Sequence, residues 1–178
     1  MNINKKTEYA PILIPTLCRA NHFIQLVESL KKNSWAKYTE LYIAVDYHSN
    51  EKYQKGRNEI CKYLKTDDLS IFKGINIILR EKNFGAFGNI DALQNDIADK
   101  YDKFISIPDD MIVSPNFIEY MNKCLNKYED DEQVVAVCGY NWPVEWDVSE
   151  GATCFKQNMT CTVWGIGYWS EKYKQARK

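Results

Sequence analysis

Short apolar runs alternate with longer amphipathic stretches along most of the chain. The apolar runs predict strands, and the stretches in which apolar residues recur every three or four positions predict helices. Strand and helix in alternation are typical of an α/β domain whose sheet is largely parallel and flanked by helices. The expected strands are Pro11–Ile14, Leu41–Val45, Ile75–Leu79, Phe104–Ile107 and Val134–Cys138, and the expected helices are Asn21–Lys32, Glu51–Lys65, Asn89–Tyr101 and Asn116–Tyr128.

The periodicity disappears between Gly139 and Cys161, where aromatic and polar residues are mixed. This segment is not rich in Ser, Gly and Pro, so we interpret it as a long functional loop and not as a linker. Its tryptophans, Trp142 and Trp146, could pack against the faces of sugar rings, although core packing is the simpler role for any single Trp. Core packing is favoured for Trp169.

Length, composition and charge exclude several classes of protein. The 178 residues are 45% hydrophobic and 26% charged, as in an ordinary globular domain, and the net charge of −1 argues against a nucleic-acid binder. No apolar stretch approaches the roughly 20 residues that span a bilayer, and the N-terminus lacks the apolar core of a signal peptide. The sequence therefore predicts a cytoplasmic protein. The basic tail, residues 172–178, could touch the inner face of a membrane, but a solvated helix end is the simpler interpretation.

The six cysteines are scattered, with no Cys-x-x-Cys pair and no zinc spacing with the two histidines. Free thiols are therefore expected in place of a disulfide or zinc framework.

Two adjacent acids, Asp109 and Asp110, directly follow the strand Phe104–Ile107. Ligands of open α/β sheets bind at the carboxyl ends of strands, and two carboxylates there suit Mg²⁺ or Mn²⁺ carrying a phosphate. An Asp-Asp turn without a ligand is the alternative. In either case Ser114 is expected to cap the next helix, with Pro115 at its first position.

The segment around these acids resembles the acidic metal-binding segment of GT-A-fold glycosyltransferases. The nearest likeness is to family-2-like bacterial enzymes related to N-acetylglucosaminyltransferase I, in which a strand, Glu-Asp-Asp, an apolar step, Ser-Pro and a helix follow one another. One position departs from that pattern, because Pro108 stands where the family has glutamate. Four segments carry the resemblance and occur in the family's order: 11–19, 101–121, 128–143 and 162–169.

The resemblance implies a single GT-A domain over residues 1–178 that moves a sugar from a nucleotide-diphosphate donor, with UDP favoured, to an acceptor hydroxyl. Inversion at the sugar carbon and a role in glycan biosynthesis are expected. Asp110 would bind Mn²⁺ or Mg²⁺, and the donor would contact Pro15, Thr16, Arg19, Asp46, Asn83, Gly85 and Asp109. The acceptor side would include Tyr140, Asn141, Trp164 and Gly165.

Several of these residues have simpler alternative roles. The loop carrying Thr16 and Arg19 could be merely solvated, while Asp46 and Asn83 could each cap a helix. The loop that carries Thr16 and Arg19 lacks the Gly-rich, Arg-containing pattern of sugar-phosphate nucleotidyltransferases. A metal-dependent nucleotidyltransferase is therefore a less favoured function.

The general base that an inverting enzyme needs lies, in the related families, beyond the Trp-Gly segment. The chain stops at Lys178, so the resemblance implies that the segment carrying this base is missing. The remaining nearby carboxylates are Glu145, Asp147 and Glu171, and none matches the family's position. A non-catalytic domain that binds a nucleotide sugar or a glycan is therefore the alternative function.

Overall fold

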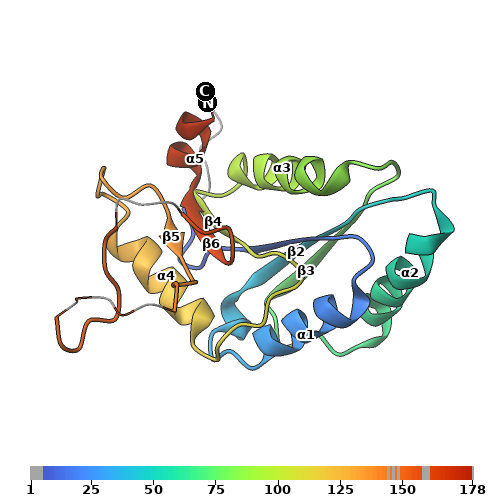
Figure 1. Cartoon of the computed structure of the whole chain (residues 1–178), viewed down its shortest axis with the longest axis horizontal. Coiled ribbons are helices and arrows are strands. Elements are labelled where there is room, and N and C mark those ends of the chain that lie inside the picture. Colours follow the sequence, from blue (N-terminus) through green and yellow to red (C-terminus); the bar gives the residue numbers. More distant parts are fainter. Residues whose placement is uncertain (1–5, 144, 146, 148, 158–160, 178) are drawn as a thin grey trace.

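A six-stranded sheet with helices on both faces forms the centre of the protein (Figure 1). The structure, a computed structural model, describes residues 6–143, 145, 147, 149–157 and 161–177. The strand order is β3-β2-β1-β4-β6-β5; the first four strands are parallel, and β6 runs antiparallel to both β4 and β5. The predicted α/β class and largely parallel sheet are confirmed.

Each predicted helix and strand is present, although several boundaries move. None of the described helices is long and apolar enough to cross a membrane. The elements in chain order are β1 Ile12–Thr16, α1 Ala20–Lys31, a 3₁₀ turn Ala36–Tyr38, β2 Glu40–Val45, α2 Glu51–Thr66, β3 Gly74–Leu79, α3 Gly85–Ala98, β4 Lys103–Ser106, α4 Phe117–Lys127, β5 Val137–Cys138, β6 Ile166–Trp169 and α5 Ser170–Ala176.

The two faces of the sheet bury separate hydrophobic clusters. Helices α1, α2 and α4 cover one face, and α3 and α5 cover the other (Figure 1). Because side chains alternate along a strand, Ile12 and Ile14 of β1 join the larger cluster while Leu13 joins the smaller one. Burial on both faces explains why β1 and β2 are nearly continuous apolar runs in the sequence.

Four local expectations were wrong. Helix α3 begins at Gly85 and not at Asn89, so the Gly85 turn, with a φ of 70°, is itself the entry to the helix. Ser114 does not cap α4, because its hydroxyl bonds Asn116 Oδ1 while its carbonyl accepts from Phe117 in a turn before the helix. Strand β5 has only two residues, and β6 was not expected as a strand.

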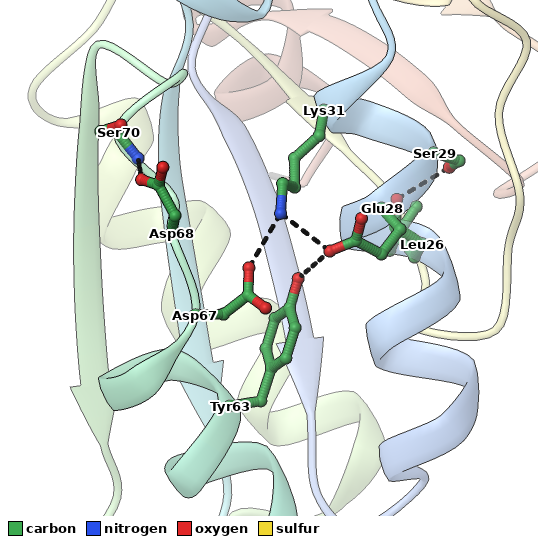
Figure 2. Close-up of polar contacts among 8 residues, drawn as sticks. All are labelled: Leu26, Glu28, Ser29, Lys31, Tyr63, Asp67, Asp68 and Ser70. Atoms are coloured by element: carbon green, nitrogen blue, oxygen red, sulfur yellow. Dashed lines mark hydrogen bonds and ion pairs between the residues drawn. The ribbon is translucent and has the colours of Figure 1, made fainter.

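A polar network joins the C-terminal parts of α1 and α2 (Figure 2). Lys31 Nζ lies 3.0 Å from Glu28 Oε1 and 2.8 Å from Asp67 Oδ1. The hydroxyl of Tyr63 donates to the same Glu28 oxygen over 2.7 Å. The hydrogen bonds from Tyr63 and Lys31 lower the pKa of Glu28, and burial raises the pKa of Tyr63.

The lowered pKa of Glu28 predicts a small acid-dependent loss of stability. The ionised carboxylate stabilises the fold above its ordinary pKa of 4.5, and this contribution disappears as the pH falls through the lowered folded-state pKa. Solvent screening limits the effect to about 0.5 kcal/mol. Urea unfolding from pH 7 to pH 3 should therefore show a shallower decline for Glu28→Gln than for the wild type. Glu59→Gln, an exposed change on α2, is the control, and equal slopes for all three proteins would contradict the prediction.

Candidate functional site

Three predicted donor-side residues lie together at the carboxyl ends of adjacent parallel strands. Thr16 ends β1, Asp46 follows β2, and Asp109 follows β4. The backbone N–H of Asp46 donates to the carbonyl of Thr16 over 2.8 Å, which joins the first two strand ends directly. This edge of a parallel sheet is where α/β proteins bind their ligands.

Arg19 and Thr16 hold the two adjacent aspartates. Asp109 is 3% exposed and accepts hydrogen bonds from the Thr16 hydroxyl, at 2.6 Å, and from Arg19 Nη2. The side chain of Asp110 is 39% exposed and accepts from Arg19 Nη1 at 2.7 Å. One guanidinium therefore bridges both carboxylates. Partial burial opposes the charge of Arg19, but the bonds and charges of the two aspartates outweigh it and raise its pKa.

Asp46 organises the turn that leads into α3. It is 3% exposed, and its Oδ1 accepts from the backbone N–H of Tyr47 at 2.9 Å and of Phe84 at 3.0 Å. The Asn83 amide donates to the Tyr47 carbonyl at 2.7 Å. Neither Asp46 nor Asn83 caps a helix, since Asn50 caps α2 and α3 has no side-chain cap. Within the described part of the chain, Oδ2 of Asp46 has no hydrogen-bond partner.

Helix α2 fixes the position of the loop that carries Thr16 and Arg19. A Cβ atom placed on Gly56 would lie 1.9 Å from the carbonyl oxygen of Cys18. The backbone of α2 therefore lies directly against this loop, and only glycine leaves the space for it. Pro15 lies within β1, one residue before Thr16.

The predicted acceptor-side residues reach the same edge of the sheet through β6. Because β6 is antiparallel to β4 and Ile166 pairs with Ser106, Trp164 and Gly165 stand at the end of β4 that leads to Asp109. Gly165 has a φ of 75°, and its carbonyl accepts from the N–H of Gly139 at 2.7 Å.

Three aromatic side chains meet next to the contact between Gly139 and Gly165. The ring of Tyr140 lies 4.9 Å from that of Trp164 and 5.8 Å from that of Trp142, and the two indoles are 5.8 Å apart. Trp142 is 47% exposed and Trp164 is 38% exposed. We call these three residues the aromatic cluster. Trp146, also expected to contribute, lies outside the described residues.

A cavity of about 720 Å³ lies beside the aromatic cluster, between α4 and the segment after β5. Its lining residues include Ser114, which is four residues after Asp110, and Tyr140 and Asn141. Lys156 is the one charged side chain among its described lining residues, and it is paired with Asp131.

Of the three carboxylates considered as bases, Glu171 lies away from the aspartate pair. The register places Trp169 opposite Lys103, so Glu171 follows β6 at the other end of β4, roughly 20 Å from Asp109 at 3.3 Å per residue. Glu145 and Asp147 are exposed, and neither forms a hydrogen bond or ion pair with another described residue.

The residues at the edge fit a divalent ion that is bound together with a nucleotide. Among the described residues no group of three or more His, Cys, Asp or Glu side chains forms a complete metal site. Mg²⁺ and Mn²⁺ need only one or two carboxylates when phosphates and water supply the remaining oxygens. Asp110, half-exposed beside the buried Asp109, offers that donor set.

Two contributions to this edge were not found from the sequence. Arg57 of α2 donates from Nε to the carbonyl of Asp46 at 2.9 Å, and the Phe84 amide binds the Asp46 carboxylate. Both contacts join segments that no local pattern connects, so only the packed fold shows them.

Comparison with known proteins supports the fold. No protein-family model matches the chain, and no curated protein does. The crystal structure of residues 1–349 of S. aureus TarS matches with a TM-score of 0.59 at 13% identity, covering 95% of this chain and 49% of that one. The mannosyltransferase PcManGT from Pyrobaculum calidifontis, in complex with GDP-Man and Mn²⁺, matches with a TM-score of 0.55 at 11% identity, covering 73% of this chain and 34% of that one.

These likenesses establish the GT-A glycosyltransferase fold that the sequence predicted. The chain spans about half or less of the length of each solved structure described above. The narrower resemblance to N-acetylglucosaminyltransferase I stays a prediction.

Proposed function

We propose that this domain binds a nucleotide-diphosphate sugar with a divalent ion and transfers the sugar to an acceptor hydroxyl during glycan biosynthesis. The observation that carries the proposal is the joining of Thr16, Arg19, Asp109 and Asp110 at the carboxyl edge of a GT-A sheet. UDP is the proposed nucleotide and inversion the proposed outcome, both from the sequence resemblance. The sugar transfer is proposed to take place in the cytoplasm.

The donor-side residues divide into those that read the nucleoside and those that face the phosphates. The free Oδ2 of Asp46 can accept a hydrogen bond from a base N–H or a ribose hydroxyl, while its Oδ1 keeps the Asn83–Gly85 turn in place. Arg19 carries five N–H donors in a fork that suits phosphate oxygens. Pro15 and Thr16 would line the donor site, and Asp109 would contact the ribose or the sugar.

Mn²⁺ or Mg²⁺ bound at Asp110 would neutralise the charge that builds on the departing nucleoside diphosphate. The protein's part is to keep Asp109 buried and oriented by the Thr16 hydroxyl. This contact fixes the position of one carboxylate before a ligand arrives, which lowers the reorganisation needed on binding.

The acceptor is proposed to lie along the aromatic cluster and the neighbouring cavity. Sugar C–H faces pack on aromatic rings, and Asn141 and the tyrosine hydroxyls of the cavity can bond sugar hydroxyls. Lys156, the one charged residue among the described lining, is neutralised by Asp131, so this surface suits an uncharged glycan better than an anionic one.

Calorimetric titration of UDP with and without Mn²⁺ tests the donor site. The wild type should bind UDP in a metal-dependent way, and Asp110→Ala should weaken that binding at least roughly tenfold, since even outer partners of a metal cost that much. Asp91→Ala is the matched control, because Asp91 is also a half-exposed aspartate paired with an arginine, Arg177, but lies on α3. Wild-type protein that binds no UDP under either condition would end the enzyme proposal for this chain.

A second candidate is a domain that binds the donor or a glycan without catalysis. It is favoured by one observation: Glu171 lies at the opposite end of β4 from the aspartates, and Glu145 and Asp147 have no described partner to orient them. Incubation with a panel of nucleotide sugars separates the two functions. Release of nucleoside diphosphate, even slowly and to water, supports the enzyme, whereas binding without release supports the second candidate.

A further inference from the structure

The site that would receive a divalent cation already contains a cation of the protein's own. Arg19 places one guanidinium nitrogen on each of the two carboxylates, on Asp109 through Nη2 and on Asp110 through Nη1. The Arg19 side chain forms no other hydrogen bond with the described residues. A metal ion bound to Asp110 would share that carboxylate with the guanidinium and would be repelled by its positive charge.

We propose that Arg19 is an internal counter-ion that competes with the divalent cation for the aspartate pair and moves to the donor's diphosphate when the cation binds. This inference rests on the proposed function, since it concerns the order in which ion and nucleotide occupy that site. It predicts that the ion alone binds weakly and that ion and nucleotide bind tightly together.

The exposure of the three side chains is suited to such an exchange. Arg19 is 51% exposed on its side chain and Asp110 39%, so both can change partners without unpacking a core. Asp109 is 4% exposed on its side chain, but the Thr16 hydroxyl also donates to it at 2.6 Å, a bond that does not involve Arg19. Arg19 lies immediately before α1, in a loop that the backbone of α2 holds fixed, so its side chain can swing while the main chain stays still.

The charges give the direction of the exchange. Two carboxylates and one guanidinium sum to one net negative charge, which attracts a cation only weakly. A diphosphate brings at least two further negative charges, so that the ion and Arg19 together supply three positive charges against four negative ones in the assembled site. Nucleotide and ion should therefore increase each other's affinity by the same factor, as linkage requires.

Binding of Mn²⁺, followed through the electron paramagnetic resonance signal of the free ion, tests the exchange in the whole chain. Without nucleotide, Arg19→Ala should bind Mn²⁺ about tenfold more tightly than the wild type, because the competing charge is gone. The Mn²⁺ affinity of Arg19→Lys, which keeps the charge but not the forked donor geometry, should lie between those of the wild type and Arg19→Ala.

In calorimetry at saturating Mn²⁺, Arg19→Ala should bind UDP about tenfold more weakly than the wild type. Arg177→Ala, which removes an arginine paired with Asp91 at 2.9 and 3.0 Å, is the matched control and should change neither affinity.

The proposal predicts that Arg19→Ala binds Mn²⁺ more tightly and UDP more weakly than the wild type. Removal of a purely structural arginine would weaken the binding of both ligands. Equal or weaker Mn²⁺ binding by Arg19→Ala, in a protein that thermal unfolding shows to be folded, would overturn the exchange. The measurement with Mn²⁺ alone decides this even if no variant binds UDP, a result that would count against the proposed donor and not against the competition.

Discussion

Replacing Gly56 with alanine should destabilise the protein and weaken nucleotide binding at the same time. The added Cβ would lie 1.9 Å from the carbonyl oxygen of Cys18 and 2.8 Å from its carbonyl carbon, both backbone atoms that cannot rotate away. Either α2 or the loop from Thr16 to Arg19 must therefore move. Overpacking of this kind costs about 1–3 kcal/mol. A shift of the loop should also cost about tenfold or more in UDP affinity, since Thr16 and Arg19 orient both aspartates.

Urea unfolding and calorimetry of the same samples measure the two effects. Gly88→Ala in α3 is the matched control, because its Cβ would meet only the Phe84 side chain at an ordinary 3.6 Å. That substitution should stabilise the protein by up to about 1 kcal/mol, since alanine favours a helix over glycine. If Gly56→Ala had the same stability and UDP affinity as Gly88→Ala, the close approach of α2 to the Cys18 backbone would be contradicted.

Replacing Phe104 with alanine should cause the largest loss of stability of any change considered. Phe104 is fully buried in the smaller hydrophobic cluster, with its ring centre 5.3 Å from that of Tyr173 and 5.7 Å from that of Tyr168. Removing a buried phenyl ring costs about 3–5 kcal/mol. That is a large part of the roughly 5–15 kcal/mol that separates folded from unfolded domains.

Phe87→Ala makes the same chemical change at a position that is 86% exposed, and it should alter stability by no more than about 0.5 kcal/mol. Urea unfolding of the two variants separates the effect of burial from the effect of the Phe→Ala change itself, because both variants make the same change. A loss below 1 kcal/mol for Phe104→Ala would mean that α3 and α5 do not pack over β4 as described.

The parts of the site predicted from sequence are those that local patterns determine. Asp109 and Asp110 directly follow an apolar strand, and Asp46 follows another, so the parallel order of the strands was sufficient to bring these acids to one edge. The partner of the aspartates was not predicted. Arg19 was expected to contact the donor, and the structure shows it bound to the two carboxylates, 90 and 91 positions away in the sequence, contacts that only the packed fold determines.

The parts that were wrong or missed have local causes. Strand β6 is four residues long and includes Gly167, so its pattern is too short to separate from a loop, and it becomes a strand only by pairing with β4. Ser114 followed by Pro115 is a common helix start, but the turn closed by its carbonyl delays α4 to Phe117. The position of Glu171 depends on the direction of β6, which no sequence pattern reveals.

The pairing of Cys138 with Ile166 has a consequence for how this protein could diversify. The long excursion after β5 leaves the sheet and returns to it at neighbouring positions of two paired strands, and Gly139 and Gly165 fasten its base. Its two ends are therefore held by the sheet whatever lies between them, and a change in its length alters the cost of closing it only slowly. The excursion is thus an interchangeable module: its residues can be replaced wholesale while the sheet edge that carries Asp46, Asp109 and Asp110 keeps its geometry.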